Sequence, residues 1–316
     1  MSLGDPTFKM VQEVEGDGDP PSPPQPMTAN IRIKCPDQTG VVAAVAQLLH
    51  GHGVNILETD QYTDRSTGIY FQRLKVDYSL MIVGQRNTSV LETALGEMAK
   101  RYHMEWSIAY TGRLKKVAIL VTKDDHCLYD LLIRHRSGEL ECELATIISN
   151  HEKLRQAKRN MFGIPFRHLP IPSAAEGGKR AQEVQVEAVL DELGIDVIVL
   201  ARYMQILTKD FCEKHWTHTI NIHHSFLPAF MGAKPYHKAH VRGVKIIGAT
   251  AHYATTDLDA GPIIEQGVTR ISHNDSVEDM IRKGRDLERI VLARAVRWHL
   301  SDAVLVDGNK TVIFGS

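Results

Sequence analysis

Apolar and polar residues alternate along the first third of the chain with two different periods. Residues 31–35 alternate with a period of two, which predicts a β-strand, and residues 41–50 carry apolar side chains at helical spacing. Thr39 or Asp37, in the turn before this helix, is expected to cap it. Further strands are expected at 54–60, 68–76 and 104–110, with a second helix at 87–102. The order βαββαβ predicts a ferredoxin-like sandwich of about 80 residues.

The pattern from residue 116 onward favours a different architecture. Residues 196–201 are nearly all apolar, which is typical of a parallel strand covered on both faces. Alternating strands and helices indicate a doubly wound, mostly parallel α/β domain. The other strands are predicted at 116–122, 141–150 and 166–170, and the helices at 126–136, 151–159 and 181–193. A long amphipathic helix at 276–300, with Asp275 and Ser276 as its cap signal, and a hairpin at 303–314 end the chain.

The length of 316 residues makes two domains the natural expectation. Residues 1–28 are rich in proline, glycine and aspartate, so they cannot bury enough apolar surface to offset their ordering entropy, and we expect a disordered tail. The first domain is placed at 29–111 and the second at 112–316.

Charge and composition exclude several classes of partner. The 37 basic and 38 acidic residues give a net charge of -1, which provides no attraction to nucleic acid or an anionic membrane. The sequence contains no apolar run of roughly 18 residues that would span a bilayer. The N-terminus lacks the order of a signal peptide, and the four cysteines show no Cys-x-x-Cys pair. We therefore expect a cytoplasmic protein with reduced thiols.

Two segments gather polar side chains where strands give way to loops. Asn221, His223 and His224 follow one apolar run, and His252 and Asp259 follow another. Open α/β sheets place their active sites at such strand ends. An amide, imidazoles and a carboxylate suit attack at a carbonyl carbon, because they offer an oxyanion donor and proton-transfer groups. Alternation along a strand predicts that Asn221 and His223 face one way and His224 the other.

These motifs resemble those of the formyltetrahydrofolate-dependent formyltransferase fold: Asn-x-His, Ser-x-Leu-Pro, a histidine, then Asp-x-Asp-x-Gly-Pro-Ile-Ile. Within this fold the chain looks most like the formyltetrahydrofolate deformylase family, from about residue 30 to the C-terminus. The loop at 121–128 has no glycine cluster and two consecutive acids, so it is a poor phosphate cradle. It matches the deformylase pattern Lys-x-x-His-Cys-Leu, whereas transformylases of glycinamide ribonucleotide carry a Gly/Ser-rich loop there.

The resemblance implies hydrolysis of 10-formyltetrahydrofolate to tetrahydrofolate and formate, which supplies formate for purine synthesis and balances one-carbon folate pools. Asn221, His223 and Asp259 match the catalytic triad, and His252 matches a supporting histidine. His224 stands where many members carry proline, and it either helps to direct water or packs. One alternative is a formyltransferase with an amine acceptor, and another is a folate- or amino-acid-binding regulator without catalysis.

The resemblance also implies a folate site, with the folate as substrate and no cofactor. A Tyr-Met-x-Ile-Leu loop by itself favours core packing, but family members hold the pterin in this loop, largely through the backbone. The implied folate-binding residues are Leu200, Arg202, Tyr203, Met204, Gln205, Ile206, Leu207, Thr256, Asp257 and Leu258. A second loop, with Gly232, Pro235, Tyr236 and His240, resembles the acceptor side of the pocket.

The first domain resembles an ACT domain, a small-ligand-sensing module. In that family amino acids bind near the first strand-to-helix turn, at a contact between two such domains. This implies an effector site at Asp37, Gly40 and Asn55, for which glycine and methionine are the ligands to test. ACT pairing implies a homo-oligomer, either a dimer or a tetramer. The alternative is a domain used only for oligomerisation.

Sixteen histidines raise the alternative of a zinc enzyme. His223, His224, His237, His240, His252 and Asp259 could in principle bind zinc and activate water. However, the sequence shows neither a His-x-x-x-His helix pair nor Cys/His ligand spacing among them. We therefore expect no metal.

Overall fold

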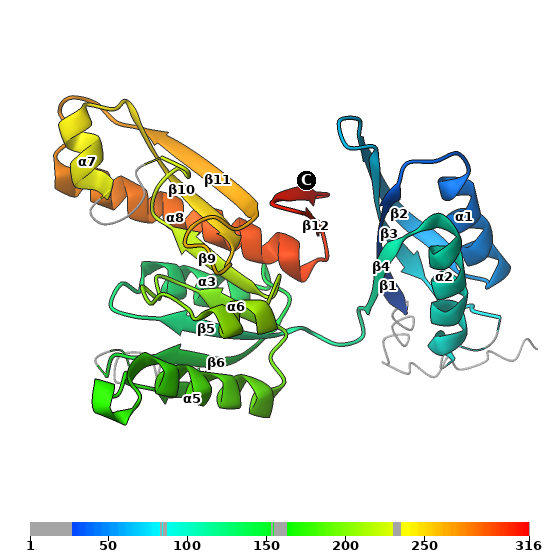
Figure 1. Ribbon diagram of the computed structural model, residues 1–316, viewed down its shortest axis with the longest axis horizontal. Coiled ribbons are helices and arrows are strands. Elements are labelled where there is room, and N and C mark those ends of the chain that lie inside the picture. Colours follow the sequence, from blue (N-terminus) through cyan, green and yellow to red (C-terminus); the bar gives the residue numbers. More distant parts are fainter. Residues whose placement is uncertain are drawn as a thin grey trace, which may run out of the picture.

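The computed structural model describes residues 27–82, 84, 87–152, 154, 163–229 and 235–315. The predicted tail lies almost wholly outside the described residues, as do most of the predicted helix at 151–159 and Gly232. The described chain forms two α/β units joined by residues 111–115, and both units appear side by side in Figure 1.

The N-terminal unit is a four-stranded antiparallel sheet with two helices on one face (Figure 1). Its strand order is β2-β3-β1-β4, which confirms the predicted ferredoxin-like sandwich. The apolar side chains of β1 pack under the helices, whereas Asn30, Arg32 and Lys34 alternate to the other face. The elements are β1 (Thr28–Pro36), α1 (Val41–Gly51), β2 (Asn55–Asp64), β3 (Ile69–Asp77), α2 (Thr88–Tyr102) and β4 (Glu105–Tyr110).

The predicted cap of α1 is wrong. Gly40 is the N-cap, with a left-handed φ of 93°, and no side chain makes a cap hydrogen bond. Glycine adopts this conformation without steric cost, so the turn closes through the backbone and neither Thr39 nor Asp37 is needed. The predicted Ser276 cap of the long C-terminal helix α8 (Val277–Leu300) is confirmed, because its hydroxyl accepts a hydrogen bond from the Asp279 N–H.

The second unit is built on a seven-stranded sheet of order β11-β10-β9-β8-β5-β6-β7. In this order the five strands β9, β8, β5, β6 and β7 run parallel, while β10 and β11 pair antiparallel at the other edge. Its elements are β5 (Lys116–Val121), α3 (His126–Arg136), β6 (Glu143–Ser149), β7 (Phe166–His168), a 3₁₀ turn (Ala174–Glu176), α5 (Gly178–Leu193), β8 (Val197–Leu200), α6 (Lys209–Lys214), β9 (Thr219–His223), α7 (Pro235–Arg242), β10 (Ile246–Tyr253), β11 (Ile263–Arg270), α8 (Val277–Leu300), β12 (Val304–Asp307) and β13 (Lys310–Ile313).

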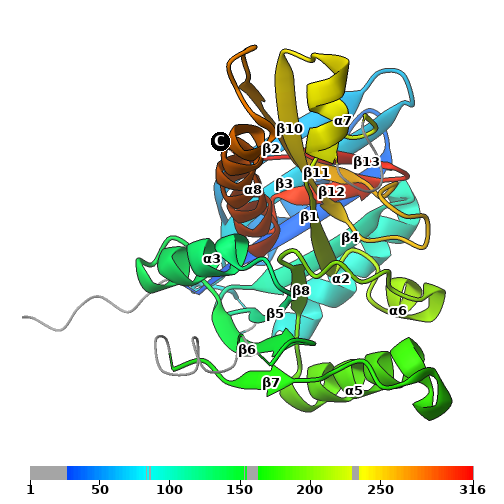
Figure 2. The same cartoon turned by 90° about the vertical axis from the view of Figure 1, so that its left-hand side faces the viewer.

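Helices cover both faces of this sheet, as the doubly wound prediction requires (Figure 2). One buried cluster packs α3 and α8 against the sheet, and another packs α5 and α6 against the opposite face. The helix α8 then leads into the β12–β13 hairpin, which lies between the two units (Figure 1). Among the described residues, no helix combines the length and apolar character needed to cross a bilayer.

Candidate functional site

The two central polar segments meet across the β9–β10 ladder. Asn221 is paired with His252, and His223 is paired with Thr250, so two imidazoles and an amide lie at the carboxyl end of β9. This is the edge of a parallel sheet at which ligands usually bind. The structure therefore brings together Asn221, His223 and His252, as the sequence predicted.

His252 fixes the orientation of the Asn221 amide. The Nδ1 atom of His252 lies 2.9 Å from the Tyr253 carbonyl oxygen, which can only accept, so Nδ1 carries the proton. Burial holds the pKa of His252 below its usual value, which leaves the ring neutral and makes Nε2 an acceptor. Asn221 Nδ2 donates to this Nε2 over 3.1 Å. The second N–H of the same amide nitrogen is then left for a ligand oxygen.

His223 and Asp259 form the second pair of the site. The Nδ1 atom of His223 lies 3.1 Å from Asp259 Oδ1, and both side chains are largely buried. The hydrogen bond from His223 holds the pKa of Asp259 below its usual value, so the carboxylate stays ionised. The Nε2 atom of His223 is buried and has no hydrogen-bond partner in the described part of the chain. This nitrogen is available for proton transfer.

The turn that carries Asp259 is held in an uncommon conformation. Asp259 has a left-handed φ of 57°. A Cβ on Gly261 would lie 1.9 Å from the Tyr253 carbonyl oxygen, so only glycine allows the turn to approach β10 this closely. Backbone strain of this kind persists where surrounding structure enforces it, and it concentrates at functional sites.

His224 lies beyond the end of β9, between two rings. Its ring is perpendicular to that of His223 at a centroid distance of 5.0 Å, and it meets Tyr236 edge-on at 6.1 Å. Burial and the nearby charge of Arg202 lower the pKa of His224 to about 4. Its buried Nδ1 has no protein partner among the described residues. The ring therefore packs between its neighbours, and a role for Nδ1 in directing water stays a prediction.

The predicted folate loop divides into buried and exposed side chains. Leu200 and Tyr203 are in the core, so they could meet a ligand only through their main chains. Arg202 and Met204 have left-handed φ values of 63° and 51°, which gives the loop a sharp, irregular path. The side chains that remain exposed are Met204, Ile206 and, on the Asp259 turn, Thr256, Asp257 and Leu258, with Gln205 and Leu207 half-buried.

A buried polar cluster beneath this loop was not foreseen from the sequence. Glu288, on α8, is 1% exposed and accepts hydrogen bonds of 2.8 Å from His126 and from Tyr236. Arg202 lies 3.6 Å from the same carboxylate and 3.1 Å from Asp124. Although burial alone would raise the pKa of Glu288, these partners hold it below its usual value. The sequence feature that could have revealed this cluster is the Glu288 carboxylate, which stands among the apolar positions of the helix predicted at 276–300.

This cluster contains His126 and Cys127 of the Lys-x-x-His-Cys-Leu motif, and it includes a group that could be mistaken for a metal site. His126, Cys127 and Glu288 are the described residues whose ligand atoms converge, lying within 4.8 Å of one another. Both oxygens of Glu288 already accept from protein donors, and the Arg202 cation lies beside them. A neighbouring fixed cation opposes a metal ion, so the group is a hydrogen-bonded ion cluster.

The acceptor-side residues are arranged differently from the prediction. Pro235, Tyr236 and His240 lie on the helix α7, where a loop was expected. Proline fits the first turn of a helix, where its missing N–H has no intrahelical partner anyway. His224, Phe226, Tyr236 and Ile247 help to line an apolar cavity of about 170 Å³ between α7 and the end of β9.

The structure does not bring the predicted effector residues together within one chain. β1 and β2 are both antiparallel to β3, with Pro36 paired to Ile69 and Asn55 paired to Asp77. Asn55 therefore lies at the opposite end of the sheet from Asp37 and Gly40. The β3 partners of Pro36 and Asn55 are eight residues apart, which corresponds to roughly 26 Å along a strand. The expectation that they are neighbours is wrong for a single protomer. A site that uses all three would need a second copy.

Comparison with known proteins agrees with this architecture. The formyl transferase family model matches residues 115–296, and the ACT domain model matches residues 29–83. Fold and site thus define a formyl transferase with an N-terminal ACT domain. A formyltetrahydrofolate deformylase from a Synechocystis species is 51% identical over 92% of this chain and 99% of its own. The chain therefore belongs to the formyltetrahydrofolate deformylase family.

The similarity to other deformylases extends over both domains. A formyltetrahydrofolate deformylase from Bacillus subtilis is 46% identical over 89% of this chain and 92% of its own. The crystal structure of a formyltetrahydrofolate deformylase from Pseudomonas syringae has a TM-score of 0.86 and 43% identity, covering 92% of this chain and 96% of that one. The crystal structure of a glycinamide ribonucleotide transformylase from Symbiobacterium toebii has a TM-score of 0.60 and 27% identity. This match covers 65% of this chain and 97% of that one.

Proposed function

We propose that this protein hydrolyses 10-formyltetrahydrofolate to tetrahydrofolate and formate. The observation that carries the proposal is the His223–Asp259 pair beside the oriented Asn221 amide, in a chain of the deformylase family. Formyl transfer to water changes no oxidation state, so we expect the folate to be a substrate and the reaction to need no cofactor.

Each member of the triad has a role that follows from its contacts. Asn221 Nδ2, held by His252, donates its second N–H to the oxyanion that develops on the formyl carbon. Asp259 fixes the proton of His223 on Nδ1 and stabilises the charged ring. His223 Nε2 then takes a proton from the attacking water and returns it to N10 of the leaving folate.

The folate would lie along the strained loop after β8. The exposed apolar side chains of Met204, Ile206 and Leu258 offer a flat surface for the pterin, and the main chain between Arg202 and Leu207 offers hydrogen-bonding groups. The Arg202 side chain points into the buried cluster, so its contribution would be through the backbone.

Transfer to a phosphorylated amine is the weaker alternative. Asp124, just before α3, is ionised and pairs with Arg202 at 3.1 Å and Arg285 at 3.3 Å. A carboxylate at the start of this helix repels a phosphate instead of binding it.

The test is formate release from 10-formyltetrahydrofolate with water as the sole acceptor, with and without chelator. Asn221→Ala, His223→Ala and Asp259→Ala are each expected to retain folate binding and lose activity by about 10²–10³. His50→Ala, at an exposed position on α1, is the control for the substitution itself. Full activity in all three triad variants would exclude the assignment, and release that requires an added amine would favour a transferase.

We further infer that the ACT domain pairs with a second copy in a homo-oligomer. The separation of Asn55 from Asp37 supports this, because only two copies could combine both ends of the sheet into one amino-acid site. Light scattering with and without glycine or methionine, followed by binding of each to Gly40→Val, tests both parts.

A further inference from the structure

The main chain of Tyr253, the last residue of β10, is linked to both halves of the triad through His252 and Pro262. Its carbonyl oxygen accepts from His252 Nδ1 at 2.9 Å, which sets the tautomer that orients Asn221. Its N–H donates to the Pro262 carbonyl at 3.0 Å, which ties down the far end of the Asp259 turn. Gly261 packs against the carbonyl oxygen of Tyr253. A displacement of Tyr253 would therefore disturb Asn221 and Asp259 together.

The side chain of Tyr253 is anchored outside the active site. Its hydroxyl lies 2.8 Å from Nδ1 of His299, in the last turn of α8. Burial, with Lys115 and Arg32 nearby, holds the pKa of His299 well below its usual value, and burial raises that of Tyr253. The phenol therefore donates and the neutral imidazole accepts. The hydroxyl has no role in the triad chemistry itself.

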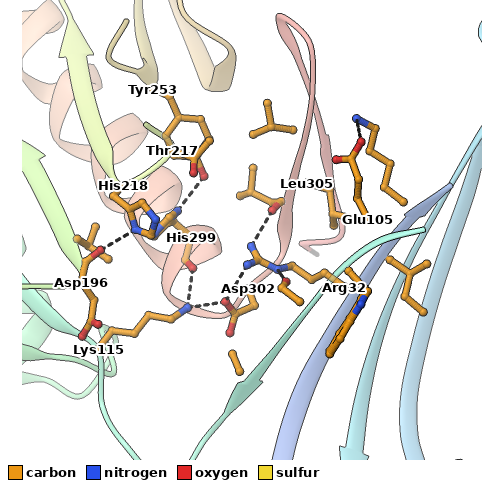
Figure 3. Close-up of a pocket in the computed structure, with 18 residues that line it drawn as sticks. Arg32, Glu105, Lys115, Asp196, Thr217, His218, Tyr253, His299, Asp302 and Leu305 are labelled. Atoms are coloured by element: carbon orange, nitrogen blue, oxygen red, sulfur yellow. Dashed lines mark hydrogen bonds and ion pairs between the residues drawn. The ribbon is translucent and has the colours of Figure 1, made fainter. Parts of the chain in front are cut away.

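His299 is in turn held by the junction of the two domains. Lys115 Nζ, from the segment that joins the domains, donates to the carbonyl oxygens of His299 at 3.2 Å and Leu300 at 2.8 Å. The same ammonium group lies 2.6 Å from Asp302. Lys115, His299 and Asp302 line one wall of a cavity of about 410 Å³ between the domains, which Figure 3 shows.

The ACT domain completes this junction from the other side. Asn30 Nδ2 donates to Asp302 over 3.2 Å, and Arg32 lies 4.0 Å from the same carboxylate and 3.2 Å from the Val304 carbonyl oxygen. Because a cavity separates much of the two walls, polar contacts and not continuous packing hold the domains in register here. Asp302, 5% exposed, is their common acceptor. We call Lys115, Asp302, Asn30 and Arg32 the interdomain joint.

We propose that Tyr253 is a positioning residue for the triad, and that the interdomain joint holds it in place through His299. The seating of the ACT domain on α8 then sets the geometry of the Asn221–His252 and His223–Asp259 pairs. This inference rests on the proposed deformylase function, since it concerns the same site.

Tyr253→Phe tests the positioning role, because it deletes one hydroxyl and keeps the ring. We expect kcat for formate release to fall about tenfold with KM unchanged, since misplacement affects the transition state and not folate binding. Tyr70→Phe is the matched control: Tyr70 is also buried, and its hydroxyl donates to Gln61 at 3.0 Å within the ACT domain. The two variants should lose similar thermal stability, but Tyr70→Phe should keep the wild-type kcat.

Asp302→Asn tests the link between the interdomain joint and Tyr253. The single variant gives this test even if Tyr253→Phe does not fold. Asparagine tolerates the left-handed φ of 55° at this position, so the backbone is kept while the charge and one of the two acceptor oxygens are lost. We expect kcat to fall about threefold at unchanged KM, in the range of energetic coupling between distant sites. The double variant should be no slower than Tyr253→Phe alone, because both substitutions act through one contact.

The outcomes separate the two claims. Wild-type kcat in Tyr253→Phe, or a loss that appears only in KM, would overturn the positioning role. A double variant whose loss equals the product of the single losses would show that Asp302 and Tyr253 act independently, which overturns the coupling. A wild-type protein that releases no formate would instead refute the proposed function.

Discussion

Four histidines in the described part of the chain are buried or half-buried and resist protonation. Burial lowers the pKa of His215, His224, His252 and His299, and that of His224 reaches about 4. In the unfolded chain each of these rings takes up a proton near pH 6.5, whereas the folded ring does not until lower pH. The unfolded state therefore binds more protons below pH 6.5, and the free energy of unfolding decreases as the pH falls toward 4.

His224→Gln should remove part of this acid sensitivity. We expect the loss of Tm between pH 7 and pH 5 to be smaller in this variant than in the wild type. His237→Gln makes the same chemical change at an exposed position of α7 and should leave the loss unchanged. Differential scanning calorimetry at the two pH values gives the comparison. An equal loss of Tm in His224→Gln and wild type would show that His224 titrates alike in both states.

The sequence pointed to the candidate catalytic residues, which the structure brings together, but not to most of their supporting partners. Asn221, His223, His252 and Asp259 stand at strand ends in a recognisable spacing, so their type and order carry the information. The partners are non-local: the Tyr253–His299 hydrogen bond spans 46 positions and the Asn30–Asp302 bond spans 272. Local patterns contain no information about which distant residue fills such a position.

Two glycines inside helices have opposite expected behaviour. A Cβ on Gly284 of α8 would lie 2.0 Å from the Tyr236 hydroxyl, whereas one on Gly96 of α2 would meet only the Trp106 ring at 3.9 Å. The close approach at Gly284 allows Tyr236 to reach Glu288. The helix pattern alone would have favoured alanine at both positions.

Gly96→Ala should therefore stabilise the protein by roughly 0.5–1 kcal/mol, as expected for an open helix position. Gly284→Ala should destabilise it by about 1–3 kcal/mol because the side chain overpacks against Tyr236. Urea denaturation of both variants measures the difference. Stabilisation by both substitutions would contradict the close packing of α7 on α8.

Long elements were predicted well because they repeat their pattern several times. α3 spans His126–Arg136 as expected, and α8 begins within one residue of the prediction. The short helices α6 and α7, of 6 and 8 residues, were missed. They contain about two turns or fewer, which is too little for a hydrophobic period to be distinguished from a loop.

The two domains share the C-terminal end of α8. The last carbonyls of a helix have no intrahelical donors. Here Lys115 binds the carbonyl oxygens of His299 and Leu300, and Arg73 of the ACT domain binds that of Ser301 at 3.1 Å. These cations also complement the negative end of the helix dipole. No sequence pattern revealed this docking, since its donors come from the polar face of a separate sheet and from the segment that joins the domains.

Arg73→Met should uncouple the domains thermally. Its side chain is 9% exposed, so its loss leaves the Ser301 carbonyl with only the 3.5 Å contact from Asn30 and removes a buried cation from Asp60. We expect calorimetry to show the ACT domain unfolding separately, about 5 °C earlier. Lys100→Met, which breaks an exposed pair with Glu97 on α2, is the control and should leave the transition unaltered. A single, unshifted transition in Arg73→Met would show that Arg73 does not stabilise the junction.

The shared end of α8 limits how this enzyme can be recombined. A chimaera that joins the catalytic domain to a foreign sensory module would keep Lys115 but lose Arg73, Arg32 and Asn30. The Ser301 and Val304 carbonyls and the Asp302 carboxylate would then lose donors unless the new module supplied basic side chains at the same places. A chimaera joined within residues 111–115 would preserve the fold of each domain but lose the contacts between the domains. Exchange of the module should succeed only when the new module carries donors at the positions of Asn30, Arg32 and Arg73 on the sheet face that docks on α8.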